Sequence, residues 1–262
     1  MNVDPVPLPD FSDREIVRHE FRRAIVLETP GPGVVTGELE DDYHHFRVAV
    51  RHDGEHVTAV EGEAVRFPWS TCRGSELAVQ ALVGTALSPR AAVVGKAADA
   101  HAQCTHLFDL TGLAVAHAAR ADGGSRRYDV SVGKRIEGRA PATLWRDGAH
   151  VLALELDGDQ FSGPPPFMGV SLRGGFFRWA DEHLDLEGAE TAGILRRACD
   201  LCRNIDLHPN DFTVVPMTLP EGTRPVCFTI TPGRFETARR PPEWFPGGVD
   251  FAGAQRRPLG GG

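Results

Sequence analysis

Short strand-like runs separated by Gly- and Pro-containing turns make up much of the chain, and this pattern constrains its fold more than any other feature. Phe46, Val48 and Val50 alternate with polar or small residues, which is the period of a half-buried strand. An Asp-Gly dipeptide at 53–54 then separates this run from a second run at 57–60, as a hairpin turn would. We therefore predict an antiparallel sheet built from hairpins.

Two segments have the spacing of helices. The first begins near Cys104 and ends near Ala119, and the second covers residues 191–204, where Ile194 and Ala198 repeat at helical intervals. Thr191 is the expected N-cap of the second helix. The predicted fold class is α+β, with a dominant antiparallel sheet and two main helices.

The second half of the sequence resembles the first. Residues 50–60 align with 144–154, with Asp, Gly, His, Val and Ala at corresponding positions. An Arg-Arg pair precedes each hairpin and a cysteine-containing helix follows each one. We interpret this as a duplicated strand-hairpin-helix unit, with halves at 14–122 and 126–239. The alternative is a chance similarity between two Asp-Gly hairpins.

The two ends differ in composition from the predicted domain. Residues 1–13 hold three prolines and predict an extended arm, and residues 240–262 form a tail rich in Pro and Gly. Residues 14–239 are expected to form a single globular domain.

The overall composition restricts partners and location. A net charge of −8 over 262 residues, without a basic block, argues against nucleic-acid binding. No run of apolar residues is long enough to span a bilayer, and the first residues do not resemble a signal peptide. The odd number of cysteines, 5, argues against a disulfide framework and favours the cytoplasm. We expect a small-molecule substrate as the partner, no nucleic acid and no membrane, and the sequence leaves a homo-oligomer open.

The start of the first helix is one candidate site. Cys104 lies at the predicted helix N-terminus, where the helix dipole is expected to lower a thiol pKa. Asp109 follows His106 by three residues, so its carboxylate is expected to hydrogen-bond the imidazole and raise its basicity. These residues suit a general base or a nucleophile. The alternative is that Cys104 packs as a small apolar residue and His106 hydrogen-bonds to the backbone.

A second candidate lies in the acidic, histidine-rich stretch 41–45 and the strand after it. Alternation places His45 and Arg47 on the face opposite Phe46 and Val48. A His-Arg pair beside carboxylates suits binding of a carboxylate or enolate and transfer of a proton. The alternative is a solvated turn and strand end.

A zinc site is a third hypothesis. Cys199 and Cys202 form a C-x-x-C pair, and Cys104 with His106 would complete a tetrahedral set if the two helices met. The leading interpretation needs neither metal nor cofactor, because the chain has no phosphate-binding loop and no dinucleotide-binding motif.

Part of the chain also resembles a known family. The residues that carry the resemblance are an Arg-Arg strand start near His19, Gly37-Glu38-Leu39-Glu40-Asp41, Arg47, Glu63-Ala64, Pro68, Cys72, Gly84 and Cys104-Thr105-His106-Leu107. This pattern, over roughly residues 15–120, is similar to a bacterial family of domains of unknown function marked by a Cys-Thr-His-Leu segment. The resemblance implies a role near aromatic or acyl-CoA catabolism and strengthens Cys104 and His106 as candidates.

The leading expectation is a cofactor-independent enzyme that performs acid-base chemistry of the lyase, isomerase or decarboxylase type on a small carboxylated or aromatic metabolite. His106 would be the general acid or base, Asp109 its orienting partner and His45 a second acid or base. Arg47 would bind the carboxylate or oxyanion. A non-catalytic module for ligand binding or interaction is the alternative, and a zinc-dependent enzyme is the third.

Overall fold

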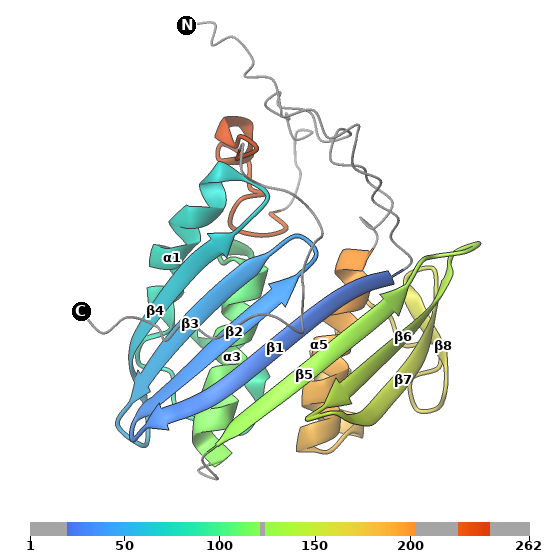
Figure 1. The fold of residues 1–262 in the computed structure, drawn as a ribbon, viewed down its shortest axis with the longest axis horizontal. Helices are drawn as coiled ribbons and strands as arrows, with labels where there is room; N and C mark the ends of the chain where they lie inside the picture. The colour runs from blue at the N-terminus through green and yellow to red at the C-terminus, as the bar shows by residue number, and fades with distance from the viewer. Residues whose placement is uncertain (1–19, 121–123, 203–224, 242–262) are drawn as a thin grey trace, which may run out of the picture.

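A computed structural model describes residues 20–120, 124–202 and 225–241, and its central element is one eight-stranded antiparallel sheet (Figure 1). The strand order is β4-β3-β2-β1-β5-β6-β7-β8. The strands are β1 (Glu20–Gly31), β2 (Val34–Asp41), β3 (His45–His52), β4 (Val57–Arg66), β5 (Ser125–Gly133), β6 (Arg139–Arg146), β7 (Ala149–Asp157) and β8 (Gln160–Gly163). The predicted α+β class with a dominant antiparallel sheet is confirmed.

The two long helices lie side by side on one face of this sheet, behind the strands in Figure 1. Helix α3 packs on β2 and β3, whereas α5 packs on β5 and β6. The α-helices are α1 (Ser75–Ala78), α2 (Val94–Ala97), α3 (Thr105–Arg120), α4 (Phe176–His183) and α5 (Leu186–Leu201), and short 3-10 turns flank the smaller ones.

Alternation along the strands creates the core. In β2 and β3, every second side chain is buried against the helices, including Leu39, Phe46 and Val48, and the residues between them are only partly buried. The helix-covered face is therefore apolar and the opposite face is polar, as expected of an antiparallel sheet with helices on one side.

Each half of the sheet is a four-stranded meander followed by a helix. The first half contains β1 to β4 and α3, the second contains β5 to β8 and α5, and the halves join where β1 pairs with β5. The predicted duplication is therefore present in the topology. The sequence alignment behind it was out of register, however. The turn at 53–54 joins β3 to β4, whereas the turn at 147–148 joins β6 to β7.

Helix α3 lies very close to the sheet because glycines face it. A Cβ on Gly37 of β2 would lie 3.0 Å from Leu110 Cδ1, and a Cβ on Gly62 of β4 would lie 3.2 Å from Leu107 Cδ1. These are tighter than ordinary van der Waals contacts, so larger residues would push the helix outward.

Helix α5 begins earlier than the sequence indicated. Its N-cap is Asp185, whose carboxylate accepts a hydrogen bond from the Gly188 N–H. The predicted cap, Thr191, lies inside the helix, and its hydroxyl donates to the Glu187 carbonyl instead. Asp185 therefore has the capping role that was expected of Thr191, because the helix begins about one and a half turns earlier.

Residues 225–241 return to the first half of the fold. The Phe228 N–H donates to the Gln103 carbonyl and the Ser70 N–H donates to the Arg239 carbonyl. Residues 227–230 form bends, although the run from Val226 to Ile230 is rich in residues that favour strands. The predicted arm at 1–13 and all but the first two residues of the predicted tail lie outside the described residues. Within the described part, none of the helices has the length and apolarity that crossing a membrane requires.

Candidate functional site

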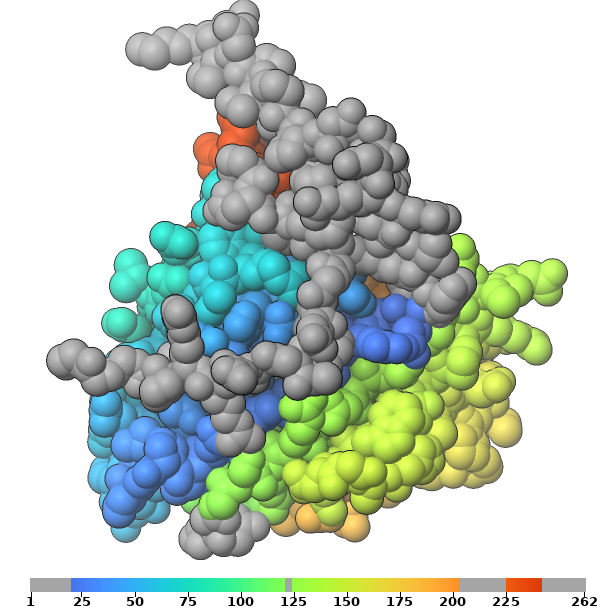
Figure 2. Space-filling model, in the orientation of Figure 1, coloured from blue at the N-terminus to red at the C-terminus, as the bar shows by residue number. Residues whose placement is uncertain are grey.

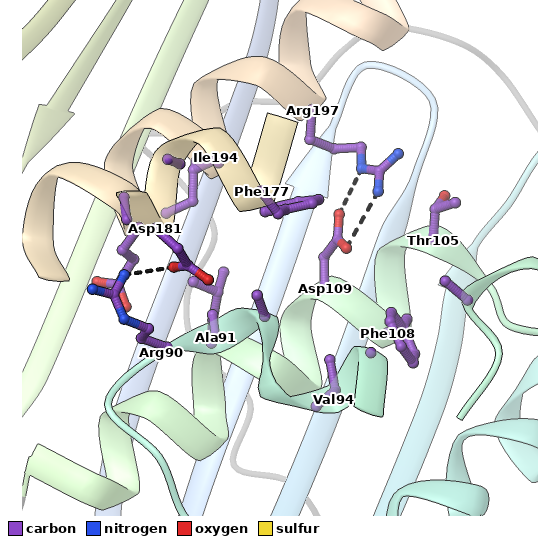
Figure 3. A pocket seen from close by; sticks show the side chains of 18 of the residues that line it. Arg90, Ala91, Val94, Thr105, Phe108, Asp109, Phe177, Asp181, Ile194 and Arg197 are labelled. Carbon is purple, nitrogen blue, oxygen red and sulfur yellow. Dashed lines mark hydrogen bonds and ion pairs between the residues drawn. The ribbon is translucent and has the colours of Figure 1, made fainter. Parts of the chain in front are cut away.

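A cavity of about 660 Å³ lies between α3 and α5, on the helix-covered face of the sheet (Figure 3). Ile25 and Leu39 from β1 and β2 form part of its floor. Phe108 of α3, Phe177 of α4 and Ile194 of α5 contribute to its walls. The cavity therefore depends on both halves of the chain, and its surface is mainly apolar, with charged side chains among the residues that line it.

Two ion pairs lie at the edges of this cavity. Asp109 and Arg197 face each other from α3 and α5 in Figure 3, with Arg197 Nε 2.6 Å and Nη2 3.3 Å from the carboxylate oxygens. Arg90 Nη1 lies 2.5 Å from Asp181 Oδ1. Burial disfavours the charge on Arg197, but the pair with Asp109 outweighs burial and raises the pKa of Arg197. The guanidinium is thus a fixed positive charge beside an apolar space.

A buried carboxylate stabilises the other end of α5 against the sheet. Glu190 accepts hydrogen bonds from the Tyr128 hydroxyl and from Arg120, whose Nη1 lies 3.0 Å from Glu190 Oε1. Arg126 Nη1 is 3.8 Å from the same oxygen. Glu190 also lines the cavity, but two arginines and a phenol already surround its carboxylate.

Asp41 is the centre of a second polar group, which we call the Asp41 cluster (Arg23, Asp41, His44 and His106). Asp41 ends β2 on the helix-covered face and its side chain is 0% exposed. Its Oδ1 accepts hydrogen bonds from the backbone N–H groups of Tyr43 and His44, both at 2.9 Å, and lies 3.0 Å from His44 Nδ1. Its Oδ2 accepts from Arg23 Nε at 3.2 Å and Nη2 at 2.5 Å.

The charges around Asp41 keep it ionised. Burial alone would raise the pKa of Asp41, but His44 and Arg23 outweigh burial and hold that pKa well below its usual value. Arg23 is itself buried and also lines the cavity. The Asp41 cluster and the cavity therefore share one guanidinium.

His106, the second residue of α3, completes the cluster from the helix-covered side of the sheet. Its ring stacks on His44, with 3.9 Å between ring centroids, and on Phe46, with 5.4 Å. Its Nε2 is buried, has no hydrogen-bond partner and lies 3.9 Å from Asp41 Oδ2. Burial and the neighbouring His44 lower the pKa of His106 well below its usual value, so the ring is neutral at pH 7.

His45 and Arg47 lie on the opposite face of the sheet. Alternation along β3 turns their side chains away from the helices. The face of the sheet opposite the helices is the one turned toward the viewer in Figures 1 and 2. There Glu38 Oε1 lies 2.5 Å from His45 Nε2 and 3.0 Å from Arg47 Nε, and Arg47 also approaches Glu63 at 3.6 Å. These four residues form an ion-pair network across neighbouring strands.

Cys104 does not have the expected thiolate character. Burial, reinforced by the nearby Cys72, raises the pKa of Cys104 to about 12. The predicted lowering by the helix dipole is therefore wrong at this position, because loss of water outweighs the dipole. The proposed zinc set also does not assemble. Among the described residues, the metal-ligand side chains whose donor atoms converge are Asp41, His44 and His106, without Cys199 or Cys202.

The predicted site residues are thus distributed over three places. His106 joins the Asp41 cluster, with Cys104 Sγ 3.9 Å from its Nδ1. Asp109 lines the cavity and pairs with Arg197, so it does not orient the His106 ring. His45 and Arg47 lie across the sheet.

The sequence patterns assigned no role to three residues that hold the Asp41 cluster and the cavity edge together, namely Arg23, His44 and Arg197. One signal was present. An Asp that accepts the backbone N–H groups two and three residues later makes an Asx turn, and Asp41 does so with Tyr43 and His44. That turn interrupts the alternation and places His44, not His45, beside Asp41. The distant pairing of Asp109 with Arg197 has no local signal.

A family model matches part of the first half of the chain. Residues 32–120 match the model of a family described as "Protein of unknown function (DUF2889)". The match runs from the turn after β1 to the end of α3, so it includes Asp41 and Asp109 but not α5. The resemblance inferred from residues 104–107 is confirmed. No curated protein matches the chain.

Proposed function

We propose that the protein binds a small carboxylated metabolite with an aromatic or aliphatic body in the cavity between α3 and α5. The observation that carries the proposal is an apolar space of about 660 Å³ with a fixed guanidinium, Arg197, at its edge. Ligand sites for small molecules have volumes of roughly 300–1,000 Å³ and combine apolar walls with a few polar groups. The cavity has this combination.

The basic side chains favour an acid as the ligand. A guanidinium has five N–H donors in a planar fork that matches a carboxylate. Asp109 accepts hydrogen bonds from the Nε and Nη2 atoms of Arg197, and a ligand carboxylate can share or displace this contact. Phe108 and Phe177 offer ring faces to the body of the ligand. A cytoplasmic location, inferred from the cysteine count, is part of the same proposal.

Binding is tested with matched pairs of small acids and amides. Benzoate, phenylacetate, 4-phenylbutyrate and hexanoate are titrated into the protein by ligand-observed NMR, with the corresponding primary amides as uncharged controls. We expect at least one acid to bind and its amide to bind at least about tenfold more weakly, since a hydrogen bond to a charged group contributes roughly 1.5–3 kcal/mol.

Two variants place the binding on one face of the sheet. Arg197→Met removes the guanidinium and keeps an apolar stem, and it should weaken acid binding about as much as the amide substitution does. Arg47→Met makes the same change on the opposite face and should leave binding unchanged. Loss of binding in Arg47→Met with retention in Arg197→Met would move the site to the outer face. A folded protein that binds none of the acids would contradict the proposal.

Acid-base catalysis on the bound acid is the second candidate, and the contact between Asp41 and His44 favours it. A carboxylate 3.0 Å from His44 Nδ1 fixes the tautomer and leaves Nε2 as the basic atom. Arg23 links this pair to the cavity. In this version of the lyase, isomerase or decarboxylase hypothesis, His44 is the general acid or base and Asp41 its orienting partner, in place of His106 with Asp109.

Proton exchange tests the catalytic candidate without a known product. Any acid that binds is incubated with the protein in D₂O, and deuterium at the carbon beside the carboxylate is followed by NMR. We expect exchange that is lost in His44→Ala and kept in His45→Ala, because adjacent imidazoles lie on opposite faces of the sheet. Absence of exchange for every bound acid would leave the protein as a binding module.

A further inference from the structure

The Asp41 cluster brings three metal-ligand side chains together from two places in the sequence, the end of β2 with its following turn and the start of α3. Asp41 ends β2, His44 lies in the turn before β3, and His106 lies in the first turn of α3. One donor atom from each of them lies within 4.8 Å of the other two. Asp41 and His106 are buried, and the His44 side chain is 12% exposed.

One atom of this cluster is poorly explained as core packing. His106 is 6% exposed, and its Nε2 has no hydrogen-bond partner although it lies 3.9 Å from Asp41 Oδ2. Burying a ring nitrogen without a partner is unfavourable. A 3.9 Å gap between a buried nitrogen and a buried carboxylate is the kind of space that a third species fills.

We propose that Asp41, His44 and His106 bind a divalent first-row transition-metal ion, with zinc as the reference case. Two imidazoles and one carboxylate form a recurrent donor set for such ions, and they leave coordination positions open. Ligand atoms about 2.0–2.2 Å from one ion are roughly 3 to 3.5 Å from each other. His44 Nδ1 lies 3.0 Å from Asp41 Oδ1 and His106 Nε2 lies 3.9 Å from Asp41 Oδ2. Binding an ion would replace the hydrogen bond between His44 and Asp41 with two bonds to the metal and would draw His106 Nε2 closer to the carboxylate.

The surroundings already hold these ligands in place. Arg23 donates to Asp41 Oδ2 and the backbone N–H groups of Tyr43 and His44 donate to Oδ1. Such outer contacts orient a ligating carboxylate. His106 Nδ1 lies 3.5 Å from Thr105 Oγ1, so the hydroxyl can accept a hydrogen bond from the Nδ1–H group, which leaves the Nε2 lone pair free for the ion.

The site adjoins the proposed ligand cavity but does not depend on it. Arg23 and Thr105 both line the cavity and both contact the cluster. An ion here would lie at the polar edge of the cavity, where an open coordination position could meet a ligand carboxylate. Metal binding is nevertheless measured on protein without any organic ligand, so the two proposals can fail separately.

The test uses full-length protein without a purification tag. The protein is stripped with a chelator, dialysed against Zn²⁺ or Co²⁺, and analysed by elemental mass spectrometry and, for Co²⁺, by visible absorption. We expect stoichiometric metal and cobalt absorption bands typical of nitrogen and oxygen ligands. His44→Ala and His106→Ala should lose both, whereas His45→Ala, which removes a neighbouring imidazole from the outer face, should retain both.

Two further measurements keep the outcome decisive. If His106→Ala does not fold, His106→Gln replaces it, and the rise in melting temperature that Zn²⁺ produces is compared between that variant and the parent. A Cys199→Ser/Cys202→Ser double variant should bind metal normally. Folded parent protein that takes up no metal would overturn the proposal. Full metal retention in both histidine variants would overturn it as well.

Discussion

The two halves of the sheet have the same topology but bury different carboxylates. In the first half, Asp41 projects from the sheet toward α3 and meets a guanidinium and two imidazoles. In the second half, Glu190 projects from α5 toward the sheet and meets Tyr128 and two arginines. Both carboxylates are buried, but only the Asp41 cluster contains a neutral ring nitrogen without a partner.

The His44 imidazole beside the first carboxylate depends on a turn and not on the order of the strands, which is the same in both halves. The turn between β2 and β3 contains Asp41 through His44 and carries an imidazole back under α3. The equivalent turn between β6 and β7 has only the two residues 147–148. The nearby His150 is exposed and packs on Trp145. Each half of the sheet thus packs against one long helix. The longer turn in the first half also places the imidazole of His44 beside the buried carboxylate of Asp41. The cavity between α3 and α5 needs both halves.

The largest expected effect separates the two buried carboxylates. Asp41→Ala should lower the free energy of unfolding by about 3–5 kcal/mol, because Arg23 would remain buried without its partner. Glu190→Ala should cost less, about 1–3 kcal/mol, since the Arg120 and Arg126 side chains are 11% and 14% exposed and can regain water. Urea denaturation at pH 7 measures both values. An equal or larger loss for Glu190→Ala would contradict the proposed difference between the halves.

A pair of helix glycines gives the next largest contrast. A Cβ on Gly112 of α3 would collide with the Ala91 carbonyl oxygen, whereas a Cβ on Gly193 of α5 would meet only the Phe177 ring, at 3.2 Å. Gly112→Ala should therefore destabilise the protein by about 1–3 kcal/mol. Gly193→Ala should be neutral or should stabilise it by up to about 1 kcal/mol, since alanine favours helix. Thermal melts of the two variants would show similar shifts if α3 were not the more tightly packed helix.

The smallest effect concerns the outer face of the first half. The hydrogen bond from His45 and, against burial, the contact with Arg47 lower the pKa of Glu38 to about 2. A lowered pKa in the folded state contributes stability above the unfolded pKa of 4.5, and this stability is lost as the pH falls from 4.5 toward 2. Because the Glu38 side chain is 35% exposed, the contribution should not exceed about 1 kcal/mol. Comparing Glu38→Gln with the parent by denaturation at pH 7 and pH 3 measures it, and an unchanged difference between the two pH values would count against the network.

Much of the fold could be predicted from local sequence patterns. Alternation in β3 and the apolar spacing of Leu110 and Leu113 in α3 are decided by burial on one face, which periodicity reports directly. The sequence alignment did not identify which strands of the two halves are equivalent. Two Asp-Gly hairpins look alike in sequence even when they join different strands, so their alignment could not identify equivalent strands.

The candidate site could be predicted only in part, because its residues are distant in sequence. His106 was a candidate and Asp41 lay in the candidate stretch 41–45, but the contact between them depends on how α3 crosses the end of β2. The three-residue spacing of His106 and Asp109 suggested a local pair, yet Arg197 from the other half holds Asp109 more closely. Ion pairs between elements far apart in the chain leave no periodic signal, and burial of Cys104 reversed a pKa expected from the helix terminus alone.

A crystal structure of the protein with 4-bromobenzoate would show whether the cavity between α3 and α5 binds a small aromatic acid, since anomalous scattering locates the bromine without ambiguity. We expect bromine in the cavity between α3 and α5, with the ring near Phe108 and Phe177 and the carboxylate on Arg197. Bromine found only on the outer face beside Arg47, or a cavity that contains no bromobenzoate at saturating concentration, would contradict the proposal.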